Sequence, residues 1–198
     1  MLLAADRFID MPVMSLQTGS ELARTVREII DPRDLTIVAY ELEGPLLDMQ
    51  PSLLRVADIR EIGQLGMIID SADELISPSD VIKIKEIYEF AFELTGKPVL
   101  DEQRHKIGRV IGYTLRAGDF VVQQLRVRRP LLKSFGDIEL LIHRSQIIQV
   151  SDDHIIVKTP AIRHKEPIAP TAAGFENPFR QSRSATESME LGHETHGR

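Results

Sequence analysis

The chain has 198 residues, with 24 lysines and arginines against 30 aspartates and glutamates, and 42% of its residues are hydrophobic. This composition is typical of a globular protein, and no apolar run approaches the roughly 20 residues of a membrane-spanning helix. The chain has no cysteine, which excludes disulfides and thiol chemistry, and Asp6 and Arg7 come too soon for a signal peptide, so we expect a cytoplasmic protein.

An internal repeat runs through most of the chain. Met11-Pro12-Val13-Met14 recurs as Lys97-Pro98-Val99-Leu100, and an offset of about 85 residues also pairs Arg24 with Arg109. An offset that stays constant over many positions predicts that one structural unit is present twice.

Each copy has the pattern of a small β-structure, with short strands and turns every 8–12 residues. A unit of about 70 residues is only marginally stable alone, so we expect the two copies to pack together. The strands expected in the first copy are Met11–Leu16, Leu22–Ile30, Thr36–Glu43, Leu53–Val56 and Gly66–Ile69. Those expected in the second copy are Pro98–Leu100, Gly108–Arg116, Phe120–Arg128, Ile138–Ile142 and His154–Lys158.

A helix is predicted between the copies. Ser77 is a suitable cap, Pro78 suits the first helical position, and Gly96 is expected to end the helix. Its apolar face is expected either to close one open barrel end or the gap between the barrels, or to serve as a docking surface. The predicted organisation is a first barrel over 1–76, a helix over 77–96, a second barrel over 97–160 and a disordered tail over 161–198.

The predicted tail contains one aromatic motif. Phe175 and Phe179 flank Glu176-Asn177-Pro178 in a segment otherwise rich in small and polar residues. We interpret the two phenylalanines either as a short protein-binding motif or as a segment that folds back onto the second copy.

The second copy resembles a known family at its start. Leu94-Thr95-Gly96-Lys97-Pro98-Val99-Leu100 with Lys106-Ile107-Gly108-Arg109-Val110 is similar to the opening strand, turn and second strand of the PRC-barrel domain. That small β-barrel occurs in the photosynthetic reaction centre H subunit and in ribosome maturation factors. The first copy departs from the motif, with Asp10 in place of Gly96 and Ala23 in place of Gly108. The resemblance covers about residues 6–160 and implies two tandem barrels with a non-catalytic assembly role.

The sequence contains no recognisable catalytic or cofactor motif. There is no phosphate-binding glycine loop and no nucleophile elbow. Ser151-Asp152-Asp153-His154 is a common turn sequence, and His193-Glu194-Thr195-His196 lies in the predicted tail. We therefore expect a protein that is not an enzyme and that has no resident metal or cofactor.

Charge distinguishes the two copies. Glu41 and Glu43 of the first copy stand at the repeat positions of Arg126 and Arg128, so one outward strand face is acidic and its counterpart is basic, with Arg129 next to it. Three interpretations remain open: two solvated faces, faces that attract each other within or between chains, or a basic face that binds RNA or an anionic membrane.

The function favoured by these patterns is a scaffold or adaptor that assembles with itself or with a protein partner. The alternative is an RNA- or ribosome-associated maturation factor that uses the basic face. The candidate binding residues are Glu41, Glu43, Arg126, Arg128, Arg129, Phe175 and Phe179.

Overall fold

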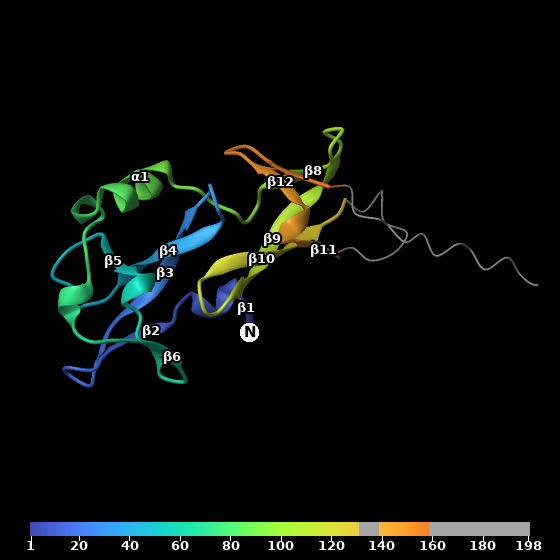
Figure 1. The fold of residues 1–198 in the computed structure, drawn as a ribbon. Helices are drawn as coiled ribbons and strands as arrows, with labels where there is room; N and C mark the ends of the chain where they lie inside the picture. The colour runs from blue at the N-terminus through green and yellow to red at the C-terminus, as the bar shows by residue number, and fades with distance from the viewer. Residues whose placement is uncertain (131–138, 159–198) are drawn as a thin grey trace, which may run out of the picture. The chain divides into compact units, whose positions relative to one another are not determined.

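The computed structural model describes residues 1–130 and 139–158, and these residues are mainly β-structure (Figure 1). The mainly β fold class expected from the sequence is thus confirmed. The predicted disordered tail, with Phe175 and Phe179, lies outside the described residues. The strands of the first half are β2 (Pro12–Ser15), β3 (Glu21–Asp31), β4 (Thr36–Glu43), β5 (Ser52–Arg55), β6 (Glu61–Gly63) and β7 (Gly66–Ile69).

The second half repeats the strand order of the first. In each half a long hairpin is flanked by one short antiparallel strand on either side, and a last strand pairs in parallel with the first. The internal repeat is therefore present as one topology used twice. The strands are β8 (Pro98–Leu100), β9 (Lys106–Arg116), β10 (Val121–Arg128), β11 (Glu139–His143), β12 (Ile147–Val150) and β13 (Ile155–Val157), and β1 (Leu2–Ala4) adds to β9.

The two halves share one open sheet, where we had expected two closed barrels in tandem. The thirteen strands form a single hydrogen-bonded arrangement whose main path runs from β12 to β6. No pairing among the described strands joins β5 to β6 or β11 to β12, so neither half closes on itself. In the first half the outer edge of β5 is occupied by Ile76, which exchanges backbone hydrogen bonds with Leu53, so β6 does not pair there.

The junction between the halves is a local pseudo-two-fold contact. Ile37 donates its backbone N–H to the carbonyl of Phe120 (3.1 Å), and Val122 donates to the carbonyl of Leu35 (3.0 Å). Leu35 and Phe120 are repeat counterparts, as are Ile37 and Val122, so the two bonds are equivalent. Leu35 and Phe120 also share a left-handed backbone conformation, each with φ of 55°. Because β4 and β10 meet only at their first residues and are antiparallel, they run away from each other.

Aromatic packing supports this junction from inside. Phe8, Tyr40 and Phe120 form a buried trio with ring centroids 5.4–6.2 Å apart, in a core that contains side chains of both halves. The Tyr113 hydroxyl donates to the Glu28 carboxylate at 2.5 Å, and these two residues are repeat counterparts. The packing between copies that their small size predicts is therefore a shared core.

The connecting segment forms a shorter helix than we expected. Ser77 caps the turn η4 (Pro78–Asp80), and α1 (Ile82–Phe90) follows it. The helix ends where Ala91 adopts a left-handed conformation with φ of 48°, and the expectation that Gly96 ends it is wrong. Ile84 and Ile87 pack on the first half in a cluster with Ile29, Ala39 and Leu53.

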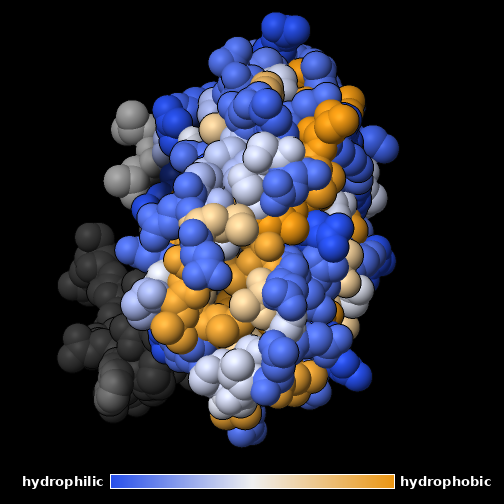
Figure 2. All heavy atoms as spheres, turned by 90° about the vertical axis from the view of Figure 1, so that its left-hand side faces the viewer, coloured by the Kyte–Doolittle hydropathy of each residue, from blue (hydrophilic) through white to orange (hydrophobic). Residues whose placement is uncertain are grey.

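The surface of the first half carries scattered apolar residues. Figure 2 shows apolar patches separated by polar side chains on this side of the molecule. Among the exposed apolar residues of the first half are Leu65 and Ile82, with 67% and 78% of their surface exposed.

The aromatic trio generates a stability prediction. Phe120→Ala should lower the free energy of unfolding by about 3–5 kcal/mol, because it leaves a cavity in the core beneath the junction. Urea unfolding of the full chain, followed by circular dichroism, measures this change. Phe90→Ala is the matched control, since Phe90 is 48% exposed, and its cost should stay below about 1 kcal/mol. Equal costs for the two variants would contradict the role given to Phe120.

Candidate binding grooves at the ends of the repeated hairpins

Each half has a groove at the end of its long hairpin that is remote from the junction. The groove of the first half has a volume of about 430 Å³ and is lined by the start of β3 and the end of β4. The groove of the second half has a volume of about 580 Å³ and is lined by the start of β9 and the end of β10. The repeat thus places one type of groove at two opposite ends of the paired hairpins.

The same backbone geometry builds both grooves. The N–H of Asp10 donates to the carbonyl of Thr25, and the N–H of Gly96 donates to the carbonyl of Val110, both at 2.8 Å. Asp10 (φ 57°) and Gly96 (φ 87°) both adopt the left-handed conformation, which Asp tolerates better than most residues. The replacement of glycine by Asp10 in the first copy therefore keeps the turn.

A glycine is needed where the two paired long strands approach each other most closely, and the halves place it differently. In the second half, a Cβ on Gly108 would overlap the carbonyl oxygen of Arg128. In the first half Ala23 stands at this position, and a Cβ on its neighbour Gly44 would lie 2.9 Å from the Ala23 Cα. Gly44 is the counterpart of Arg129. At these two positions the first half has Ala23 and Gly44, whereas the second half has Gly108 and Arg129.

The two grooves carry opposite charge. The groove of the first half, called here the acidic groove, has the carboxylates of Asp10, Glu21 and Glu43 and the guanidinium of Arg24. The groove of the second half, called here the basic groove, has four cationic side chains and no carboxylate among its described lining residues. Those side chains are Lys106, Arg109, Arg128 and Arg129.

One pair of counterpart arginines shows the electrostatic consequence. Arg24 and Arg109 each donate from Nη1 to a backbone carbonyl at 2.9 Å, to Asp10 and Gly96 respectively. Arg24 is also bound by the carboxylates of Asp10 (3.2 Å) and Glu21 (2.9 Å), which raise its pKa. In the second half glycine and Lys106 replace those two carboxylates, so Arg109 has no carboxylate partner among the described residues.

The structure separates the predicted acidic residues. Glu43 is exposed and lines the acidic groove. Glu41 is half-buried, pairs with Arg27 of β3 (2.6 Å) and accepts a hydrogen bond from the Tyr88 hydroxyl of α1 (3.3 Å). Glu41 therefore takes part in the attachment of α1 to the first half, and it does not line a groove.

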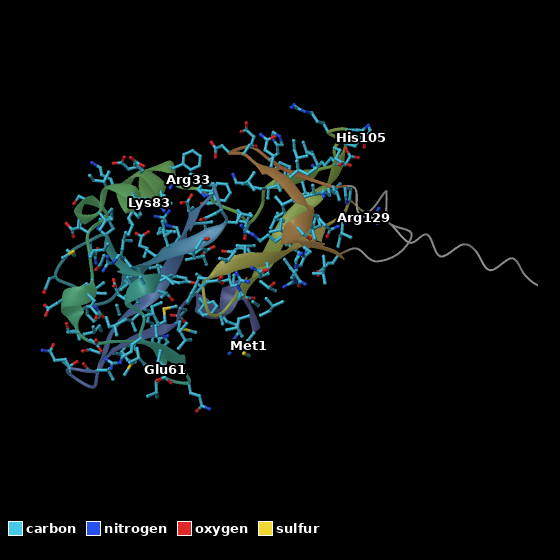
Figure 3. The ribbon with its side chains drawn as sticks, in the orientation of Figure 1. Met1, Arg33, Glu61, Lys83, His105 and Arg129 are labelled. Atoms are coloured by element: carbon cyan, nitrogen blue, oxygen red, sulfur yellow. The ribbon has the colours of Figure 1, made fainter. Side chains whose placement is uncertain are left out.

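The predicted basic residues are divided in the same way. Arg128 and Arg129 line the basic groove, and Figure 3 labels Arg129 beyond the end of β10. Arg126 lies on the outward face of β10, 3.6 Å from Glu139 of β11. Lys106 and Arg109 were not singled out from the sequence, although the repeat offset already pairs Glu21 with Lys106 and marks a reversal of charge.

A smaller cavity of about 250 Å³ lies between the halves, with Asp6, Glu28, Tyr113 and Arg126 in its wall. Burial and the neighbouring Glu28 carboxylate raise the pKa of Tyr113 far above its usual range, so the phenol stays protonated and donates to Glu28. This pair therefore forms a fixed hydrogen bond between the two halves.

Within residues 1–130 and 139–158 there is no group of three or more histidine and acidic side chains that would hold a metal ion.

Comparisons with known proteins give little to add. No family model matches the chain, and no curated protein matches it. A solved structure that matches is that of a protein described as a 16S ribosomal RNA processing protein, RimM, from Pseudomonas aeruginosa. The match covers 80% of this chain and 97% of that chain at 16% identity, with a TM-score of 0.27. A likeness at this TM-score carries no argument about fold or function.

None of the described helices is long and apolar enough to cross a membrane. The longest, α1, has nine residues.

The close approach of the two strands at Gly108 generates the second prediction. Gly108→Ala should lower the free energy of unfolding by about 1–3 kcal/mol or more, because the added methyl group meets the Arg128 backbone. Gly118→Ala is the matched control, since no atom lies within 4 Å of a Cβ at that position. Urea unfolding of both variants measures the difference, and a Gly108→Ala protein as stable as Gly118→Ala would show that the strands do not approach this closely.

Proposed function

We propose that this chain is a non-catalytic adaptor that binds an acidic segment of a protein partner in the basic groove. The observation that carries the proposal is the difference between the two grooves. Carboxylates compensate Arg24 in the acidic groove, whereas Lys106, Arg109 and Arg128 have no carboxylate partner among the described residues. A groove with uncompensated cations attracts an anionic ligand and orients it.

The groove also offers apolar surface suited to a polypeptide. Val110 and Ile111 lie in its lining beside the cations, and Pro130 stands at its end. Guanidinium groups bind carboxylates in a forked geometry, and the apolar lining suits the apolar parts of a peptide. In this proposal each half is a PRC-type module, and the cysteine-free chain works in the cytoplasm.

The alternative is that the basic groove binds RNA, in the manner of a ribosome-associated maturation factor. Its support is Arg128 and Arg129 in the groove, with Arg126 nearby on β10, because arginine also binds phosphate through two parallel hydrogen bonds. Against it, none of the described residues that line the groove is aromatic, so the groove lacks the stacking surface that single-stranded RNA binders use.

The adaptor proposal predicts charge-dependent peptide binding. A fluorescein-labelled glutamate-rich peptide should bind the full chain, and Arg128→Glu should weaken binding about tenfold or more, because a like charge then faces the ligand. Fluorescence anisotropy at low and moderate salt measures the affinity. Arg104→Glu is the control, since it makes the same charge change at an exposed position outside the groove, and its affinity should stay close to that of the unaltered chain. Equal losses in both variants would attribute binding to net charge alone.

The RNA alternative makes a separate prediction. If it is correct, the chain is retained on heparin and co-sediments with ribosomal subunits, and both properties disappear when Arg126, Arg128 and Arg129 are changed to glutamine. On the adaptor proposal, the chain does not follow ribosomal subunits at physiological salt. Vesicles with and without anionic lipid, tested in the same way, distinguish a membrane surface from RNA.

A further inference from the structure

The two halves differ at one sheet edge as well as in their grooves. In the first half the free edge of β5 is covered, because Leu53 donates to the carbonyl of Ile76 (2.8 Å) and Ile76 donates back to Leu53 (2.9 Å). The segment that contributes Ile76 continues into α1, whose Ile84 and Ile87 pack over the same strand.

The corresponding edge of β11 has no such cover among the described residues. Leu53 pairs with Glu41, and Leu141 pairs with Arg126, the counterpart of Glu41, so Leu141 occupies the place of Leu53. Its N–H and C=O therefore face away from β10, as those of Leu53 face away from β4. No described residue forms a backbone hydrogen bond with Leu141 on that side, and 60% of Leu141 is exposed.

We infer that β11 pairs antiparallel with β11 of a second copy, about a two-fold axis at Leu141. The sequence of β11 is complementary to itself in this register. Leu141 faces Leu141 of the second copy, and Glu139 faces His143, so an acidic side chain meets a basic or neutral one at each end of the pairing. All three side chains lie on the outward, exposed face of the strand.

The charged residues of β11 favour this one pairing, although on many edge strands such residues prevent pairing with other chains. Charged residues on an edge strand discourage pairing with arbitrary strands. Here Glu139 and His143 oppose each other in the antiparallel register, whereas a parallel register would set glutamate against glutamate. The molecule already joins its own halves by antiparallel pairing about a pseudo-two-fold axis, at β4 and β10.

The inference does not depend on the basic groove, which lies at the ends of β9 and β10. A five-residue edge offers little contact area, so we expect a weak dimer that forms as the protein concentration rises. A strand from another protein and a part of this chain outside the described residues are the other possible occupants, and with either of them β11 does not pair between copies.

The first experiment uses cross-linking of the full chain, which has no cysteine of its own. Directly opposed residues in an antiparallel pair have Cβ atoms about 4.5–5.5 Å apart, and a hydrogen-bonded pair lies at the long end of this range, beyond the about 3.5–4.5 Å of a disulfide, so a short bismaleimide is used to link the thiols. Leu141→Cys should therefore be linked into a covalent dimer by the bismaleimide. Leu65→Cys, at an exposed leucine of the β6–β7 turn, should stay monomeric. Equal cross-linking of both variants, or none at residue 141, would overturn the inference.

Sedimentation velocity of the full chain over a range of concentrations is the second experiment. The unaltered chain should shift towards a dimer, and Leu141→Pro should remain monomeric, because it removes an N–H that faces away from β10 and leaves the β10–β11 ladder in place. Leu141→Lys keeps the N–H and should weaken the dimer less than proline does. Circular dichroism checks that each variant is folded. A concentration-independent monomer for the unaltered chain would disprove the pairing, and binding of the glutamate-rich peptide is measured separately.

Discussion

The reciprocal backbone hydrogen bonds between β4 and β10 are the contact on which the rest of the described structure depends. They join residues that are about 85 positions apart in sequence and equivalent in the repeat. Two such bonds contribute only about 0.5–1.5 kcal/mol each, so the buried Phe8, Tyr40 and Phe120 supply most of the stability of the junction. Because this junction lies at one end of each long hairpin, the halves share one sheet, and the opposite ends of the hairpins carry the two grooves.

One topology used twice leaves room for the two copies to diverge in chemistry. In the first half these groups already have partners within the chain. Arg24 is bound by Asp10 and Glu21, Tyr88 of α1 binds Glu41, and the segment before α1 covers the edge of β5. The second half lacks carboxylates at the corresponding positions and, among its described residues, the covering segment. Binding functions are therefore proposed for the second half, at the basic groove and at the edge of β11. In both places the corresponding groups of the first half have partners within the chain.

Most strands were predictable, because strict alternation and turn residues are local signals. The end of α1 was not, because Gly96 is a strong stop signal whereas Ala91 adopts a left-handed conformation that its residue type seldom takes. Of the charged candidates, Glu43, Arg128 and Arg129 lie in the grooves. Glu41 was placed with them because it shares their strand face, and no pattern in the sequence showed that Tyr88 and Arg27 would bind it.

The sequence by itself determined the duplication, the mainly β class and the reversal of charge between the copies, since each of these is carried by residue types at a constant offset. Only the tertiary structure decided that the copies merge into one open sheet, and which charges are compensated. Strand pairing between the copies and the partners of each ionised side chain depend on contacts between residues far apart in the chain. Arg24 and Arg109 occupy the same place in the repeat, and only their folded neighbours distinguish a neutralised arginine from one that is open to an anionic ligand.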